Sequence, residues 1–280
     1  MNIEDPLANV QLHSEINGCG HPLLFLHGFG TNTHSWRYLV GTLSTSHQTI
    51  ALDLKGFGAS PKPLDAAYSI YDQAALVREF ILQHDLWDIT LIGHSFGGAV
   101  ALATLFYFSE EERRRISRLI LIDALAYRQD LPVFISILTT PILGFAALNL
   151  LPNTWQAKFC LMYAYHDSSK ITDDTVALYA TPLNTPGAQH ALTQTAYQLL
   201  PIDANKLSDQ YKQINFPVLI IWGQHDHIIP LEAAHRLNKD IPNSELVILK
   251  ESGHMPFEEQ PQETLSAMVK FLNKAIPTSR

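Results

Sequence analysis

The chain has 280 residues, of which 46% are hydrophobic and 16% charged, so it carries enough apolar material for a large core and is not a disordered chain. Its length suits one domain of ordinary size with an insertion, or two small domains. The net charge is −8 at pH 7, and the basic run at residues 113–115 directly follows three glutamates. Nucleic acid is therefore not an expected partner.

The two cysteines, Cys19 and Cys160, are too few for a disulfide framework and do not have the spacing of metal ligands. The first five residues include two acidic and no basic side chains, and no basic segment precedes an apolar run, so we expect no signal peptide. These features predict a cytoplasmic protein.

Strand-like and helix-like segments alternate over the first 122 residues. Residues 10–16 lead through an Asn-Gly-Cys-Gly turn into the apolar run 22–27, which predicts an antiparallel hairpin. Further strands are expected at residues 48–54, 89–93 and 119–122, and helices at residues 35–43, 68–84 and 96–108. Apolar strands joined by helices indicate a parallel sheet that is covered on both faces.

The alternation stops over residues 125–211, which have helix-like and loop-like sequence without an obvious buried strand. It resumes with strands at residues 217–222 and 245–249 and helices at residues 231–237 and 263–275. We therefore expect a core formed by residues 1–124 and 212–280, with residues 125–211 as a helical cap, because so long a connection normally folds and has a function.

Residues 131–157 contain no charged side chain, which raises the question of a membrane span. Three prolines, at positions 132, 141 and 152, interrupt this stretch, and polar side chains lie among the apolar ones. An apolar lid over a pocket is the preferred interpretation, and contact with a membrane surface is the minor alternative.

The strongest local pattern is Gly-His-Ser-Phe-Gly-Gly at residues 93–98, between an apolar strand and an apolar helix. A sharp strand-to-helix turn strains its central residue and requires very small neighbours, which Gly93 and Gly97 provide. The turn would expose the Ser95 hydroxyl above the sheet, as a candidate nucleophile. The alternative is a glycine-rich turn with an incidental serine.

A serine hydroxyl needs a base to accept its proton, and the base needs an acid to orient it. Asp226 and His254 each follow a late predicted strand, so we expect them at the same sheet edge as Ser95, with the acid first and the base second in the chain. Asp123 also follows an apolar strand and is the competing candidate for the acid. Its position along the chain favours Asp226.

The chain contains 13 histidines, so a histidine alone indicates little. His225 and His227 flank Asp226, but a His-x-His pair without a third ligand at useful spacing is a weak indication of zinc. We predict no metal site, and His254 remains the candidate base because it lies in a loop after a strand.

Acyl transfer also needs backbone N–H groups that bind the developing oxyanion. The Phe96 amide at the start of the helix is one candidate. The loop His-Gly-Phe-Gly at residues 27–30 follows an early strand, and the Phe29 amide is the second candidate. A purely structural glycine turn is the alternative for this loop.

The motifs at residues 27–30 and 93–98, the segment Asp-Leu-Lys-Gly-Phe-Gly-Ala-Ser at residues 53–60, Asp226 and Gly253-His254 together resemble the α/β-hydrolase fold superfamily, in its capped esterase and carbon–carbon hydrolase branch. The resemblance implies a mostly parallel, predominantly eight-stranded sheet with helices on both faces and a helical cap inserted after the sixth strand. It also implies Ser95, Asp226 and His254 as a catalytic triad that uses no cofactor.

The family includes several reaction types. Dehalogenases and epoxide hydrolases use an aspartate nucleophile, which Ser95 disfavours, and hydrolases of ring-cleavage products commonly carry asparagine where this chain has His94. Cofactor-free haloperoxidases typically lack so long a cap. We therefore predict hydrolysis of carboxylic esters, with carbon–carbon bond hydrolysis and a non-catalytic ligand receptor as alternatives.

The predicted substrate is a small apolar ester that binds beneath the cap. Most apolar residues of the cap are expected only to pack it onto the core. The candidates for lining the pocket are Phe134, Ile137, Leu138 and Phe145.

Overall fold

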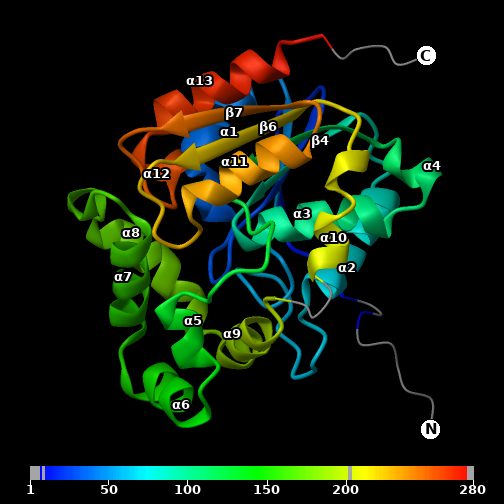
Figure 1. Cartoon of the computed structure of the whole chain (residues 1–280). Helices are drawn as coiled ribbons and strands as arrows, with labels where there is room; N and C mark the ends of the chain where they lie inside the picture. Colours follow the sequence, from blue (N-terminus) through cyan, green and yellow to red (C-terminus); the bar gives the residue numbers. More distant parts are fainter. Residues whose placement is uncertain (1–6, 8–9, 201–203, 276–280) are drawn as a thin grey trace, which may run out of the picture.

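A seven-stranded sheet forms the centre of the computed structural model, which describes residues 7, 10–200 and 204–275 (Figure 1). Its strand order is β1-β3-β2-β4-β5-β6-β7. Only the pair β1 and β3 is antiparallel, and the other neighbours in the sheet are parallel. The strands are β1 Ser14–Asn17, β2 Pro22–Leu26, β3 Gln48–Leu52, β4 Ile89–His94, β5 Ile116–Ile122, β6 Val218–Gly223 and β7 Ser244–Leu249.

Helices cover both faces of this sheet, as the apolar strands predict. Strands β4 and β6 are buried at every position, because their side chains meet a helical layer on each side. One face packs against α2 (Ile70–Gln83), α3 (Phe96–Tyr107) and α11 (Leu231–Asp240). The other face packs against α1 (Arg37–Leu43) and α13 (Pro261–Leu272).

The pairing predicted for the N-terminal hairpin is wrong. Strand β1 does not pair with β2, which follows it in the chain, but with β3, where Ser14 lies opposite Leu52. Strand β2 is hydrogen-bonded to β3 on one side and to β4 on the other, so both of its edges are occupied. The turn between β1 and β2, which contains Gly18 and Gly20 at positive φ, therefore carries the chain across β3.

The fold class agrees with the resemblance, but the strand count does not. The described residues form seven strands, and the helical insertion follows the fifth strand, β5, instead of the sixth. The insertion contains α5 Val133–Leu138, α6 Pro141–Leu150, α7 Asn153–Ala164, η2 Ser168–Lys170, α8 Asp173–Ala180, η3 Thr181–Asn184, α9 Ala188–Tyr197, α10 Ala204–Ser208 and η4 Tyr211–Gln213. Three short helices complete the core: η1 Thr33–Trp36, α4 Glu110–Arg113 and α12 Pro256–Glu259.

The insertion lies beyond the carboxyl ends of the parallel strands. Figure 1 shows α5 to α9 as a separate group of helices beside the arrowheads of β6 and β7. The uncharged stretch of residues 131–157 is divided among α5, α6 and α7, which are separated at Pro141 and Pro152. Across the described residues, every helix is too short or too polar to cross a membrane.

Candidate active site

Ser95 occupies a strained turn between β4 and α3. Its φ of 52° lies in the left-handed region, which a residue with a side chain rarely adopts. A Cβ atom at Gly93 would lie 2.4 Å from the Gly97 carbonyl oxygen, and one at Gly97 would lie 2.2 Å from the Leu26 oxygen. These contacts supply the steric reason for both glycines, and the turn holds Ser95 at the carboxyl edge of the sheet.

The loop after β2 approaches Ser95 closely. A Cβ atom at Gly28 would lie 2.8 Å from His94 Nδ1 and 3.2 Å from Ser95 Cβ, so only glycine allows this approach. The loop is held by its own contacts, since Thr31 Oγ1 and His27 Nδ1 donate to the Gly28 carbonyl over 2.9 Å and 2.8 Å. The Phe29 amide forms no hydrogen bond within the described part of the chain.

Phe96 is the first residue of α3, where a helix leaves its N–H groups without partners in the helix. Phe29 and Phe96 both line the same cavity as Ser95. Both residues expected to supply an oxyanion donor therefore lie at the same cavity as the candidate nucleophile. The positive end of α3 favours negative charge in this region.

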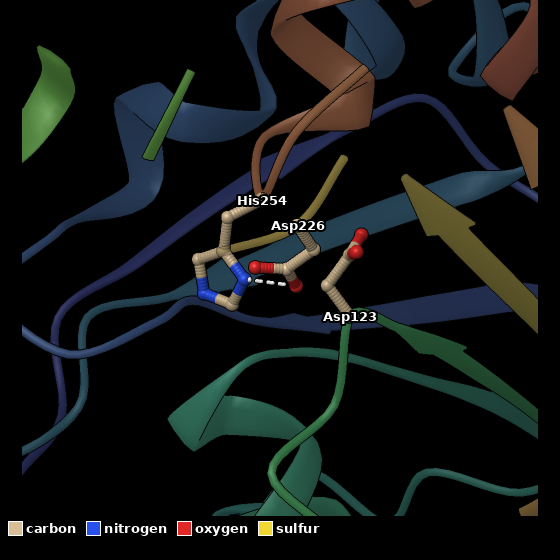
Figure 2. A group of neighbouring side chains, drawn as sticks. All are labelled: Asp123, Asp226 and His254. Atoms are coloured by element: carbon tan, nitrogen blue, oxygen red, sulfur yellow. Dashed lines mark hydrogen bonds and ion pairs between the residues drawn. The ribbon is translucent and has the colours of Figure 1, made fainter. Parts of the chain in front are cut away.

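Asp226 and His254 are joined directly. His254 Nδ1 donates to Asp226 Oδ2 over 2.7 Å, and both side chains are buried (Figure 2). The second carboxylate oxygen, Asp226 Oδ1, accepts from the Ile228 and Ile229 amides over 2.7 Å and 3.0 Å. These bonds orient the carboxylate towards the imidazole and fix the tautomer, which leaves His254 Nε2 free to act as a base.

Ser95 and His254 line one cavity, but no hydrogen bond connects the two side chains among the described residues. Hydrogen bonds of this kind are often long in ligand-free enzymes and tighten when the substrate binds. The structure therefore brings Ser95 and the Asp226–His254 pair to the same sheet edge and the same cavity.

Asp123, the competing acid, lies beside Asp226 and not against the imidazole. It follows β5 with a φ of 42°, and its Oδ1 accepts from the Gly223 amide over 2.9 Å. Its Oδ2 is buried and has no hydrogen-bond partner in the part of the chain that the structure describes. Burial, and next the charge of Asp226, raise the pKa of the Asp123 carboxyl well above its usual value, so the protonated form of Asp123 is favoured.

Asp123, Asp226 and His254 could also be considered as metal ligands, because one potential ligand atom from each lies within 4.8 Å of the others (Figure 2). The hydrogen bonds already engage both Asp226 oxygens and His254 Nδ1. A protonated Asp123 would offer a weak ligand. The cluster suits the holding of a proton better than the binding of a cation, so we keep the prediction that the site uses no metal.

His94, the residue before Ser95, supports the backbone of His254. Its Nε2–H donates to the His254 carbonyl over 2.8 Å, and its Nδ1 has no hydrogen-bond partner among the described residues. Burial, together with the neighbouring His254, lowers the pKa of His94 well below its usual value, so the ring is neutral. A neutral ring at this position adds no positive charge beside the candidate base.

The cavity has a volume of about 450 Å³ and lies between the sheet edge and the inserted helices. Three of the four predicted lining residues, Phe134, Ile137 and Leu138, are on its wall. Phe145 is not, because α6 turns Gly144 and Leu148 inward and leaves Phe145 exposed on its outer side. His225 and His227 do not line the cavity either, and His225 stacks on His166 at 3.9 Å between ring centroids.

Sequence reasoning missed two buried glutamates on α12, directly after the His254 loop. Glu258 accepts a bidentate pair from Arg37 over 2.8 Å and 2.9 Å, and it also accepts from the hydroxyl groups of Tyr165 and Tyr179. Both tyrosines belong to the inserted segment, and Tyr179 lines the cavity. Glu258 thus ties the insertion to the core.

Glu259 connects the insertion to the candidate base. Its Oε1 accepts from the Gly253 amide over 2.7 Å, and its Oε2 accepts from the His166 and Asp167 amides over 2.8 Å and 3.0 Å. The His254 amide itself donates to the Ala164 carbonyl over 2.7 Å. Two adjacent glutamates in a short helix normally face solvent, so no sequence signal distinguishes Glu258 and Glu259.

Several known hydrolases are similar to this chain over most of its length. A lipase of Moraxella sp., named lipase 3, is 27% identical over 254 residues, which cover 89% of this chain and 76% of that protein. The 2-hydroxy-6-oxo-2,4-heptadienoate hydrolase of Pseudomonas putida is 29% identical over 261 residues, covering 91% of this chain and 90% of its own. An esterase of Exiguobacterium antarcticum shares the fold with a TM-score of 0.80 at 23% identity, over 95% of this chain and 96% of that one.

Residues 21–261, which include Ser95, Asp226 and His254, match the family model of the alpha/beta hydrolase fold. The match extends from β2 to the start of α13 and so includes nearly the whole sheet and the insertion. The chain therefore belongs to the alpha/beta hydrolase fold family and is a hydrolase.

Proposed function

We propose that this protein hydrolyses carboxylic esters with an apolar acyl or alkyl group, through an acyl-enzyme on Ser95. Ser95 Oγ attacks the ester carbonyl while His254 Nε2 takes its proton, and Asp226 stabilises the imidazolium that forms. The Phe29 and Phe96 amides bind the oxyanion. His254 then protonates the leaving alcohol, and water releases the acid by the reverse sequence. In this proposal residues 125–211 form the cap over the substrate.

The observation that carries the ester assignment is the composition of the cavity wall. Among the described residues that line it, none is a lysine or an arginine, and most are aliphatic or aromatic. A dienoate substrate brings a carboxylate, whose burial without a cationic partner is costly. A neutral ester needs only the oxyanion donors and an apolar wall, and the proposed Phe29 and Phe96 amides and the apolar lining residues would supply them.

Carbon–carbon bond hydrolysis is the second candidate. It is favoured by the similarity to the heptadienoate hydrolase of Pseudomonas putida, which extends over nearly the whole of both chains. The same serine, histidine and oxyanion donors could act on an activated ketone. The cavity wall is the feature that argues against this substrate class.

A comparison of the catalytic efficiency on the two substrate classes tests the ester assignment. We would measure kcat/KM for p-nitrophenyl butyrate and for a 2-hydroxy-6-oxo-2,4-dienoate under the same conditions. The proposal predicts that the ester is preferred by at least about a hundredfold, since an unpaired buried carboxylate costs several kcal/mol. A preference for the dienoate would assign the protein to carbon–carbon hydrolysis. Binding of either compound without turnover would indicate a receptor.

A further inference from the structure

Helix α7 is apolar on two opposite sides. Trp155, Phe159 and Met162 recur at the spacing of one helical face and are exposed, Trp155 by 68%. A second apolar row on the same helix is buried: Ala157, Leu161 and Ala164. The side of α7 opposite the buried row therefore carries large apolar groups that remain exposed.

Helix α6 continues this arrangement. Ile142, Phe145 and Leu150 are 83%, 69% and 76% exposed, while Gly144 and Leu148 face inward. Figure 1 shows α6 at the tip of the insertion, away from the sheet. We call the exposed apolar residues of the two helices and their connection the outer cap face: Ile142, Leu143, Phe145, Leu150, Leu151, Trp155, Phe159 and Met162. A cluster of this kind marks an interaction surface.

The segment that carries the outer cap face is almost free of charge. Lys158 is the only Asp, Glu, Lys or Arg residue between positions 131 and 166, although the chain as a whole has a net charge of −8. An ionic partner would find no complementary charge here, and an anionic membrane would be repelled by the whole protein. The occupant of this face should therefore be electrically neutral and apolar.

The outer cap face is continuous with the cavity. Leu151, Trp155 and Phe159 are exposed on it and also line the cavity in which Ser95 lies. An apolar molecule that leaves a partner bound to the outer cap face would therefore meet only apolar side chains on its way into the cavity. A second copy of the chain would cover the same residues without supplying a substrate, whereas a lipid surface both covers them and supplies one.

We propose that the outer cap face docks onto a neutral lipid surface, from which an apolar ester enters the cavity. The claim that an ester enters the cavity from the lipid rests on the proposed function, whereas the claim that the outer cap face binds lipid does not. Helices α6 and α7, with 10 and 12 residues, are shorter than the roughly 20 residues that a membrane span requires, so they lie in the interface plane. Trp155 then sits at the boundary between headgroups and acyl chains, where tryptophan is favoured.

Flotation with phosphatidylcholine vesicles tests the docking. The wild type should float with the vesicles equally at low and high salt, because apolar burial and not charge drives the binding. Replacing Ile142, Phe145 and Leu150 by glutamine should lower the partition coefficient by at least about tenfold. These three residues do not line the cavity. The matched control replaces Leu64 and Val269, exposed apolar residues outside the insertion, and should float as the wild type does.

Tryptophan fluorescence provides a second measurement that does not depend on the folding of a triple variant. Trp36 and Trp222 are fully buried, so in Trp87→Phe the exposed tryptophan is Trp155. Its emission should shift to the blue when vesicles are added, and brominated phosphatidylcholine should quench it. An unchanged spectrum, or equal flotation of the wild type and the triple variant, would overturn the proposal.

Hydrolysis of water-soluble p-nitrophenyl acetate separates the two proposals. The triple variant should keep this activity within about twofold of the wild type, since its substitutions lie outside the cavity. A wild type that floats but hydrolyses no ester would refute the proposed function and leave the docking intact. A wild type that hydrolyses the ester but does not float would refute the docking, as would a dimer in solution that the triple substitution abolishes.

Discussion

Asp123 and Asp226 place two buried carboxyl groups side by side at the ends of β5 and β6, and only Asp226 is hydrogen-bonded to His254 (Figure 2). Two neighbouring carboxyl groups that are shielded from water cannot both be ionised at low cost. Burial favours the protonated form of Asp123, and Asp226 is the carboxyl group that faces the imidazole. The two residues should therefore respond very differently to the same substitution.

Exchange of each carboxyl for an amide tests this division. Asp226→Asn should lower kcat for a p-nitrophenyl ester by about 10³–10⁴-fold, because the amide stabilises the wrong imidazole tautomer. Asp123→Asn should lower it by less than about tenfold, because an amide is neutral like the protonated carboxyl and its oxygen can still accept from the Gly223 amide. If Asp123→Asn caused the larger loss, Asp123 would be the acid that orients His254.

The pH dependence of stability reports the protonation of Asp123. Folding raises the pKa of Asp123 above its unfolded value near 3.8. The contribution of Asp123 to the free energy of unfolding is therefore most favourable below pH 3.8, and it is lost as the pH rises towards the pKa in the folded state. Asp123→Asn removes this ionisation, so it should raise Tm at pH 8 by about 2 °C or more, with the gain shrinking towards pH 4. Calorimetric scans of both proteins across this range measure it. A constant difference at all pH values would argue against a buried proton on Asp123.

Glu259 should act on the reaction through the position of His254. Three backbone N–H groups donate to the Glu259 carboxylate, and each of its two oxygens accepts at least one of them. In Glu259→Gln an NH2 group replaces one oxygen, so a donor faces at least one of these N–H groups and a hydrogen bond is lost. We expect kcat to fall by about 10- to 100-fold with KM for a short ester within about threefold, as for a misplaced base. The control is Glu263→Gln, an exposed residue on α13. Loss of thermal stability with unchanged kcat would show a purely structural role.

Gly28 provides a steric test of the oxyanion loop. In Gly28→Ala the new Cβ atom would push against His94 Nδ1 and Ser95 Cβ, so the loop must move away from the nucleophile. We expect kcat to fall by about a hundredfold or more. Gly41→Ala on α1 is the matched control, because its Cβ atom would meet nothing within 4 Å. It should leave kcat unchanged and stabilise the fold by about 0.5–1 kcal/mol. Full activity of Gly28→Ala would exclude this loop from the reaction.

The sequence predicts local features well and long-range pairings poorly. Gly93 and Gly97 indicate the turn at Ser95 because steric demands of that turn act within a few residues. Strand β2 pairs with β3 on one edge and with β4 on the other, so β1 pairs with the free edge of β3. The residues around β1 and β2 do not indicate this, because the pairing depends on strands that are distant in the sequence.

The insertion was the least predictable part of the molecule. Helix α6 is apolar on all sides, so periodicity does not reveal that Phe145 faces outward while Leu148 faces the cavity. Most partners of Glu258 and Glu259 are distant in the chain: Tyr179 is 79 residues and Arg37 221 residues from Glu258, and His166 is 93 residues from Glu259. Their burial becomes visible only when the insertion and the core are placed together.

The most direct test of the account concerns Ser95 as the nucleophile. We would measure hydrolysis of p-nitrophenyl esters from acetyl to palmitoyl by the wild type and by Ser95→Ala, and label both proteins with a fluorophosphonate followed by intact-mass analysis. The account predicts turnover and a single adduct on the wild type, with both lost in Ser95→Ala apart from residual hydrolysis. Turnover by Ser95→Ala close to that of the wild type on every ester would contradict it.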